Sequence, residues 1–421
     1  MSFNKYSSTF LFSLLIIITW SCWDSKWKGQ DAMLKVNTQI VPIQEQVKKT
    51  YDLGKGIYSS NEFAGARLNG MVLSNDTLIT ALITPENTPI NQSPWYAFKI
   101  WSENQQDIYL KLTYLFGVKH RYYPKLSHDG INWQRLDSAN YILGSIEKKK
   151  NDRLLPDDIT MKISIGPDTL WISAQELLTS KNANTWMESL AKKPFVSMEQ
   201  IATSHQGRAI NMLKIGNADD KKMILVLSRQ HPPEVSGYLA MQSFVEVLAG
   251  ESETATKFRE MYNTYVVPMM NPDGVDNGHW RTNAQGVDLN RDWQEFNQPE
   301  TSAIRDFMQK KVLSTGGNFY LGIDFHSTFE DIYYTIDPEL KGNMPGLVNT
   351  LIDSMSLLIG DPEPNIRPRS DDEVRISSRT FFFFEFGAEA LVYEVGDETP
   401  RDLLKRKGEV AALKMMEFMV K

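Results

Sequence analysis

The sequence predicts an α/β fold in its second half, with a mixed and mostly parallel sheet flanked by helices, preceded by an antiparallel β-sandwich in its first half. Two observations predict this class. Between residues 41 and 175, apolar and polar residues alternate as they do in half-buried strands. From residue 176 to 421, short apolar runs alternate with longer segments of helical composition, as expected for layers of strands and helices.

Period-two alternation in the first half is clearest between residues 108 and 114, where Ile108, Leu110 and Leu112 share one face of a strand. Turn residues separate this strand from others that we expect at residues 78–84, 96–100, 161–165 and 170–172. Short strands at this spacing are typical of a β-sandwich. Six aromatic residues of this region either pack in its core or form a ligand platform: Trp95, Tyr96, Trp101, Tyr122, Tyr123 and Trp133.

Strands and helices are expected in turn through the second half. We expect a first helix from Ala174 to Lys193. Buried strands follow at 223–227, 265–270, 319–325 and 390–395, and helices at 236–249, 301–311, 346–358 and 403–419. In such sheets ligands bind beyond the carboxyl ends of strands, so the polar residues there are the ones to examine for function.

Length, charge and cysteine content exclude several classes of protein. A chain of 421 residues suits two domains and is far longer than a small stapled scaffold. Its net charge of −7 does not favour non-specific binding to nucleic acid. A single cysteine, Cys22, excludes intramolecular disulfides, iron–sulfur clusters and cysteine-rich zinc sites.

The N-terminal segment has the pattern of an export signal. An apolar run from Phe10 to Trp20 is too short to span a bilayer but suits the apolar core of a signal peptide, and Cys22 follows it after Ser21. This resembles a bacterial lipoprotein signal, in which the cysteine becomes the lipidated first residue. An ordinary cleaved signal and an uncleaved anchor remain as alternatives. We therefore expect a signal peptide over residues 1–22, a tether over 23–40, and a protein held on the periplasmic or cell-surface side of a membrane.

Two histidines and a glutamate follow predicted strands. His231 and Glu234 stand in the sequence His-Pro-Pro-Glu just after the strand at 223–227, and His326 closes the strand at 319–325. Two neutral imidazoles and one carboxylate are the ligands of a catalytic zinc that keeps its fourth position open. The alternative is that these are unrelated surface histidines.

Other polar residues converge on the same strand ends. Arg281 and the pair Asn290 and Arg291 supply fixed donors, and a planar guanidinium is the natural bidentate partner of a free carboxylate. Glu394 follows the apolar residues 390–392, where burial would raise the pKa of a carboxyl group toward the range of a general base. A structural, salt-bridged carboxylate is the alternative for Glu394.

Taken together, these motifs resemble the zinc carboxypeptidase family, which includes carboxypeptidase A. The residues that carry the resemblance, in order between 231 and 396, are HPPE, NPDG, WRTN, GVDLNRDW, DFHS and YEVG. The segments SPWYAFKIW and YYPKLSHDGINW in the first half, with SSRTFFFFEFGAEALVYEVG near the end, are more narrowly similar to the cytosolic carboxypeptidases. Those enzymes carry a β-sandwich before the catalytic domain, so the resemblance implies a sandwich over residues 41–175 and a catalytic domain over 176–421.

The resemblance also implies a role for each matching residue. His231, Glu234 and His326 would bind one Zn²⁺ per chain, and Glu394 would be the general base for the attack of zinc-activated water on the peptide bond. Arg281 would polarise the scissile carbonyl, and Asn290 with Arg291 would bind the terminal carboxylate of the substrate. Asp288 is interpreted as a loop residue or an outer partner of a ligand, and Asp324 as an outer partner of a ligand or a structural residue.

One feature departs from the carboxypeptidase A pattern. No tyrosine occurs between Tyr334 and Tyr393, so the tyrosine that covers the substrate in those enzymes has no counterpart. The same stretch contains Arg379, which we expect just before a hydrophobic strand, as in the cytosolic enzymes. An arginine in the side-chain pocket favours acidic C-terminal residues. A solvated loop is the alternative for Arg367 and Arg369, and equally for Arg379.

Three functions are therefore compared. The first is a zinc metallocarboxypeptidase that removes C-terminal residues, preferentially acidic ones, from peptides or proteins. The second is cleavage of stem peptides in the cell wall by the same zinc apparatus. The third is an exported binding lipoprotein without activity, which the presence of every expected ligand and of the base disfavours.

Overall fold

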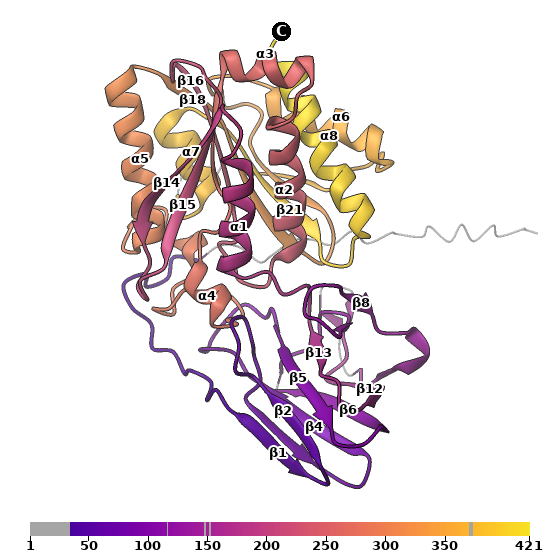
Figure 1. The fold of residues 1–421 in the computed structure, drawn as a ribbon. Coiled ribbons are helices and arrows are strands. Elements are labelled where there is room, and N and C mark those ends of the chain that lie inside the picture. The colour runs from indigo at the N-terminus through magenta and orange to yellow at the C-terminus, as the bar shows by residue number, and fades with distance from the viewer. Residues whose placement is uncertain (1–33, 116, 147–148, 151–152, 370–373) are drawn as a thin grey trace, which may run out of the picture.

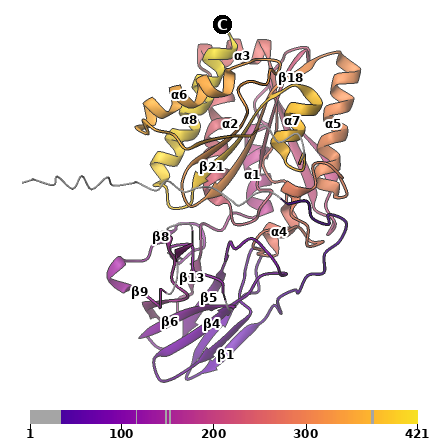
Figure 2. The same cartoon turned by 180° about the vertical axis from the view of Figure 1, so that it is seen from behind.

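A computed structural model describes residues 34–115, 117–146, 149–150, 153–369 and 374–421. The predicted signal peptide, with Cys22, and the first part of the predicted tether lie outside these residues. In Figures 1 and 2 the chain divides into a strand-rich part between residues 50 and 173, called the N-terminal sandwich below, and an α/β part that follows it.

The N-terminal sandwich consists of two sheets that share one core. Alternate residues of both sheets enter this core, for example Phe98 and Ile100 from one sheet and Ile108 and Leu110 from the other. The first sheet has the order β1 (Thr50–Gly54), β2 (Ile57–Ser60), β5 (Ala97–Ser102), β13 (Leu170–Ser173), β7 (Lys125–Ser127) and β8 (Gln134–Arg135). The second has the order β3 (Gly70–Leu73), β4 (Leu78–Ile83), β6 (Gln106–Tyr114), β12 (Ile159–Ile165) and β9 (Tyr141–Leu143). The turn η1 (Ser138–Asn140) and a small hairpin of β10 (Lys149–Lys150) and β11 (Arg153–Leu154) complete it.

The pairing in this sandwich differs from the prediction at one place. β4 and β6 run parallel, with Leu78 beside Tyr109 and Ile83 beside Tyr114, whereas the other pairs are antiparallel among the described residues. The parallel pair arises because the chain between β4 and β6 crosses to the other sheet, where it forms β5. Trp95, Tyr96 and Tyr122 are buried in the core, as the core interpretation of the aromatic residues predicts.

The α/β part is built on one large sheet. Its order is β14 (Val196–Thr203), β15 (Ala209–Ile215), β17 (Asn263–Val267), β16 (Lys222–Ser228), β18 (Asn318–Thr328), β21 (Glu389–Gly396), β19 (Ile332–Ile336) and β20 (Ile366–Arg369). Pairings from β17 through β16 and β18 to β21 are parallel, which brings the carboxyl ends of these strands to one edge. The sheet is therefore mixed and mostly parallel in its centre, as predicted.

Helices cover both faces of this sheet because its central strands are apolar on both sides. In β16, Ile224 and Val226 face a core shared with one group of helices, whereas Leu225 and Leu227 face a core shared with another. The first group contains α1 (Ser180–Leu190), α2 (Val235–Leu248), α3 (Glu253–Met261), α6 (Leu347–Ile359) and α8 (Arg401–Met419). The second contains α5 (Pro299–Thr315) and α7 (Ser378–Phe386). The short elements α4 (Pro272–Asp276) and η2 (Leu289–Arg291) lie in the loops between them.

One expected element is wrong in its extent, and one helix was not expected. The helix expected from Ala174 to Lys193 is shorter, because α1 begins only at Ser180, after its N-cap Thr179. The strand expected after Arg379, at 390–395, is confirmed as β21, but the phenylalanines between them form the unexpected helix α7, which ends at Phe386 and is capped by Gly387 in the left-handed conformation. Its phenylalanines favour a strand by local propensity, but they pack against the sheet face as a helix stripe, and this tertiary contact decides.

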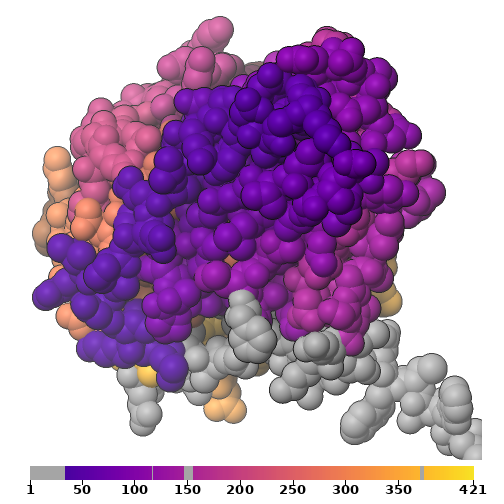
Figure 3. All heavy atoms as spheres, turned by 90° about the horizontal axis from the view of Figure 1, so that it is seen from below, coloured from indigo at the N-terminus to yellow at the C-terminus, as the bar shows by residue number. Residues whose placement is uncertain are grey.

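The predicted boundary between residues 175 and 176 stays a prediction, and the two parts meet in an extensive contact. Gln175 and Glu176, which connect them, both bind the side chain of Arg401. In Figure 3, viewed from below, residues of the N-terminal sandwich spread over most of the visible face, with residues of the α/β part at its rim. The described end of the predicted tether also contacts the α/β part, since Gln298 donates hydrogen bonds to the carbonyl groups of Thr38 and Gln39.

Candidate metal and catalytic site

The carboxyl ends of β16, β18 and β21 bring the predicted ligands together. His231 and Glu234 lie between β16 and α2, and the left-handed conformation of Arg229 turns the chain there (φ 55°). His326 was expected to close its strand. It instead lies within β18, which continues for two more residues to Thr328. Its register partner in β21 is Glu394. Segments far apart in the sequence thus meet at one edge of the sheet.

His231, Glu234 and His326 form a buried cluster of donor atoms. Their ligand atoms all lie within 4.8 Å of one another. Glu234 Oε1 is 2.8 Å from His231 Nδ1, and Glu234 Oε2 is 2.7 Å from His326 Nδ1. The two Nδ1 atoms are 3.2 Å apart. Two imidazole nitrogens and a carboxylate in this arrangement fit a zinc site with an open position.

A carboxylate holds each histidine from the opposite side of its ring. Asp288 Oδ1 forms a hydrogen bond with His231 Nε2 at 2.9 Å, whereas Asp324 Oδ2 lies 2.9 Å from His326 Nε2 as a charge contact without hydrogen-bond geometry. Such outer carboxylates fix the orientation and tautomer of a metal-binding imidazole, leaving Nδ1 for the metal. Asp324 is itself held by Gln230 and by the hydroxyl group of Ser378. Asp324 is fully buried, whereas Asp288 keeps a side chain that is 16% exposed.

Arg281 connects to the same cluster through Asp288. Its Nε donates to Asp288 Oδ2 at 2.6 Å. Its Nη2 is buried and has no hydrogen-bond partner in the described part of the chain. Burial opposes the charge of Arg281, but Asp288 and Glu234 outweigh it and raise the pKa of the guanidinium. Arg281 is thus a fixed cation whose Nη2 can donate to another molecule.

Glu394 is a buried carboxylate beside the cluster. It is 4% exposed, and its Oε2 has no hydrogen-bond partner among the described residues. Burial, followed by the nearby negative charge of Glu234, raises the pKa of Glu394 to about 7. A carboxylate with a free oxygen and a raised pKa is suited to accept a proton.

Asn290 and Arg291 lie in η2, next to Asp288. Asn290 Oδ1 accepts a hydrogen bond from the backbone N–H of Ser378, and Arg291 Nη1 donates to the carbonyl oxygen of Asn290. Burial lowers the pKa of Arg291, and the positive charges of Arg281 and Arg369 act in the same direction against the attraction of Asp288. Arg281 and Arg369 thus lie near enough to Arg291 for their charges to act on it.

The other arginines that the sequence suggested for the substrate pocket are Arg367, Arg369, Arg375 and Arg379, and they lie on different elements: two on β20, one before α7 and one in α7. Arg379 lies in the first turn of α7, is 2% exposed, and donates to the carbonyl oxygen of Thr335 at 3.2 Å. Arg375 is exposed and stacks on Phe384. Arg367 and Arg369 belong to the edge strand β20, and neither lies on the solvated loop that was the alternative for them.

Sequence reasoning missed a second group of polar residues around the site. Arg121 of the N-terminal sandwich binds Asp397, which follows β21, with Nε 2.8 Å from Oδ2. It also donates to the carbonyl oxygen of Ser327, directly after His326. Burial raises the pKa of Asp397 to about 6 against the effect of Arg121. No spacing in the sequence indicates this pair, because its members lie 276 positions apart.

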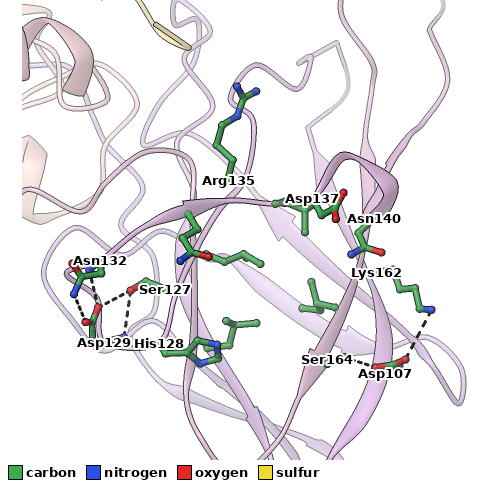
Figure 4. Close-up of a pocket in the computed structure, with 15 residues that line it drawn as sticks. Asp107, Ser127, His128, Asp129, Asn132, Arg135, Asp137, Asn140, Lys162 and Ser164 are labelled. Carbon is green, nitrogen blue, oxygen red and sulfur yellow. Dashed lines mark hydrogen bonds and ion pairs between the residues drawn. The ribbon is translucent and has the colours of Figure 1, made fainter. Parts of the chain in front are cut away.

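A cavity of about 610 Å³ also opens in the N-terminal sandwich, away from this cluster. Figure 4 shows polar side chains around it, including Asp129 bonded to Ser127 and Asn132, and Lys162 paired with Asp107. No Trp, Tyr or Phe lines it. It shares no residue with the metal cluster.

Comparison with known proteins identifies the α/β part. Residues 183–341 match the family described as zinc carboxypeptidase. The chain carries a zinc carboxypeptidase domain. Cytosolic carboxypeptidase 6 of Caenorhabditis elegans is 26% identical to this chain over 262 residues, which cover 58% of this chain and 56% of that protein. The chain thus spans little more than half the length of this relative.

Solved structures share the fold over most of the chain. A putative carboxypeptidase A from Shewanella denitrificans is 19% identical, with a TM-score of 0.69, and the match covers 86% of this chain and 98% of that one. A metallo-carboxypeptidase from Pseudomonas aeruginosa is 20% identical, with a TM-score of 0.67 and coverage of 86% and 98%. The predicted fold class, the zinc carboxypeptidase resemblance and the zinc cofactor are confirmed.

The geometry of the donor cluster depends on the close approach of α2 to β18 at Gly237, in the first turn of α2, and a substitution there tests this dependence. A Cβ atom there would lie 2.2 Å from the carbonyl oxygen of His326, so any side chain must push α2 away from β18. Gly237→Ala should therefore separate Glu234 from His326 and weaken zinc binding about 10- to 100-fold, the range seen when ligand support is lost. Competition with a zinc chelator measures this affinity.

Ser243→Ala, on the same helix, is the matched control, because its hydroxyl group bonds only to the preceding turn of α2. Zinc affinity should be unchanged in this variant. A Gly237→Ala protein with wild-type zinc affinity would show that the approach of α2 to β18 does not set the ligand geometry.

Proposed function

We propose that the protein is a zinc-dependent metallocarboxypeptidase that hydrolyses the C-terminal peptide bond of peptides or proteins. The observation that carries this proposal is the buried His231–Glu234–His326 cluster with Glu394 beside it and a free donor of Arg281 nearby. The family match over residues 183–341 supports it. A Zn²⁺ ion held by these ligands supplies Lewis-acid activation of water and of a carbonyl group.

Residues of the chain carry out proton transfer, stabilisation of the carbonyl oxygen and binding of the substrate's terminal carboxylate. Glu394 takes a proton from the attacking water and delivers it to the amine nitrogen as the C–N bond breaks, which yields a free amino acid and a shortened peptide. Arg281 Nη2 donates to the carbonyl oxygen as negative charge develops on it. Arg291 and Asn290 bind the terminal carboxylate of the substrate, which restricts cleavage to the last bond. No covalent intermediate with the protein is needed.

Digestion of a peptide library with varied C-terminal residues, followed by mass spectrometry, tests this activity. We expect stepwise loss of single C-terminal residues, its abolition by a chelator, and its recovery with zinc. Glu394→Gln should reduce turnover at least about a hundredfold, because the proton acceptor is lost, while zinc content stays near one per chain. Turnover that survives either change would contradict the mechanism, and a zinc-loaded protein inert toward all peptides would favour the binding-protein alternative.

We further propose that the enzyme prefers acidic C-terminal residues. The support for this preference is that Arg369 lies near enough to act on the charge of Arg291, and that Arg379 is a buried arginine directly after Ser378, whose hydroxyl group binds Asp324. An additional carboxylate on the last residue of the substrate would pair with one of these arginines.

Arg379→Gln tests this preference, because it removes the charge while keeping a shorter side chain that can still donate a hydrogen bond. We expect kcat/KM for peptides ending in Glu to fall about tenfold relative to peptides ending in Leu, which corresponds to about 1.4 kcal/mol. Arg375→Gln, which changes an exposed arginine of the same region, is the control. An unchanged Glu-to-Leu ratio rejects the proposed role of Arg379. Including cell-wall stem peptides in the panel decides whether they are the substrate class.

Export and anchoring are also proposed, from the sequence pattern of residues 1–22. Among the described residues, no helix is both long and apolar enough to cross a membrane. We expect incorporation of a labelled fatty acid into the protein in cells and its loss in Cys22→Ser. Equal labelling of both proteins, or none in either, would contradict lipid attachment at Cys22.

A further inference from the structure

Glu86 of the N-terminal sandwich binds the loop that carries Arg281. It follows β4 and is fully buried. Its Oε2 accepts the backbone N–H of Trp280 at 2.8 Å, and its Oε1 accepts those of Arg281 at 3.1 Å and Thr282 at 2.8 Å. The hydroxyl group of Thr282 donates to the same Oε1 at 2.7 Å. One carboxylate thus satisfies the backbone donors of Arg281 and of both its neighbours.

Among the described residues, Glu86 is the acceptor found for these three backbone N–H groups. Residues 280–282 belong to neither a helix nor a strand, and Trp280, Arg281 and Thr282 are at most 4% exposed. A buried N–H without an acceptor destabilises the folded state. The conformation of this loop is therefore stable only while an acceptor stands at the position of the Glu86 carboxylate.

The surroundings of Glu86 keep it ionised. Burial alone would raise the pKa of Glu86, but His279, Arg67 and the backbone N–H groups outweigh burial and hold the pKa below its usual range. Arg67 is itself anchored in the sandwich, where its Nε donates to the carbonyl oxygen of Thr84. The charge that holds the loop is thus fixed within the other half of the molecule.

Residues just before Arg281 in the sequence also pack against the N-terminal sandwich. Trp280 is fully buried in the sandwich core, and its indole N–H donates to the carbonyl oxygen of Trp95 at 3.1 Å. Gly278 adopts a left-handed conformation (φ 66°), and a Cβ atom there would lie 2.2 Å from the carbonyl oxygen of Ala66. The side chain of Arg281 alone turns to the metal cluster, where it binds Asp288.

We propose that Glu86 is a positioning residue for Arg281, so that the N-terminal sandwich sets part of the catalytic geometry of the α/β part. Glu86 touches no reacting atom. It fixes the backbone from which the guanidinium reaches Asp288 and presents its free Nη2. This role rests on the proposed function only in so far as Arg281 stabilises the developing charge on the carbonyl oxygen.

Glu86→Gln is the informative substitution, because it preserves size but replaces one acceptor oxygen by a donor NH₂ that faces backbone N–H groups. We expect kcat to fall at least about tenfold with KM within about twofold of wild type and with full zinc content. Loss of a transition-state donor has this kinetic signature. Glu62→Gln is the control, because Glu62 is an exposed carboxylate of the same sandwich.

A double-mutant cycle separates positioning from general destabilisation. Arg281→Ala should lower kcat about a hundredfold or more. If Glu86 acts through Arg281, adding Glu86→Gln to Arg281→Ala should lower kcat no more than about twofold further. A fully additive loss, or wild-type kcat in Glu86→Gln, overturns the proposal.

Hydrogen exchange of the zinc-loaded protein gives a readout that needs no activity. The amides of residues 280–282 should exchange faster in Glu86→Gln than in wild type and Glu62→Gln, and unchanged exchange overturns the proposal. A wild-type protein that cleaves no peptide would refute the proposed function, while the exchange rates would still decide whether Glu86 fixes the loop. If Glu86→Gln does not fold, Thr282→Val removes one of the four donors and should show the same two effects at smaller size.

Discussion

A carboxylate buried between two imidazoles is the interaction on which the rest of the α/β part depends. Glu234, His231 and His326 are each at most 2% exposed. Burying an ion costs several kcal/mol unless it is paired and hydrogen-bonded. The structure meets this cost by extending the cluster outward, with Asp324 behind His326 and Asp288 behind His231. Asp288 in turn binds Arg281, so this buried cation belongs to the same network as the donor cluster.

The same network explains why both parts of the molecule, the N-terminal sandwich and the α/β part, contribute to one site. Parallel strands bring His326 and Glu394 side by side, but Arg281 comes from a loop that has no regular secondary structure. A loop of this kind is rigid only if its backbone is bonded from outside. The N-terminal sandwich supplies that support through Glu86, and it supports the chain after His326 through Arg121. The sandwich is thus part of the structure that holds the site, and this role does not require a ligand of its own.

The residues that gather at the candidate site could be predicted from the sequence because each lies at or just after an apolar run that is easy to recognise. This holds for the three residues of the donor cluster, His231, Glu234 and His326, and for Glu394 beside it. The helix α7 could not be predicted, because four successive phenylalanines favour a strand locally, and only their packing against the sheet makes the helix stable. The sandwich residues that bind the loops of the site could not be predicted either. Glu86 pairs with residues almost 200 positions away, and no local pattern distinguishes it from the turn residues around it.

Positive charges lie within the site although the whole chain is negative. The chain carries a net charge of −7, whereas Arg281, Arg291 and Arg369 lie close enough to influence one another's pKa or that of their neighbours. Surface charges are screened over about 8–10 Å at physiological ionic strength, but groups within a buried site are screened much less. An anionic peptide end therefore interacts mainly with the guanidinium groups once it enters. Because a negative surface gives little long-range attraction to an anion, the proposed preference for acidic C-terminal residues depends on contacts with individual arginines in the pocket.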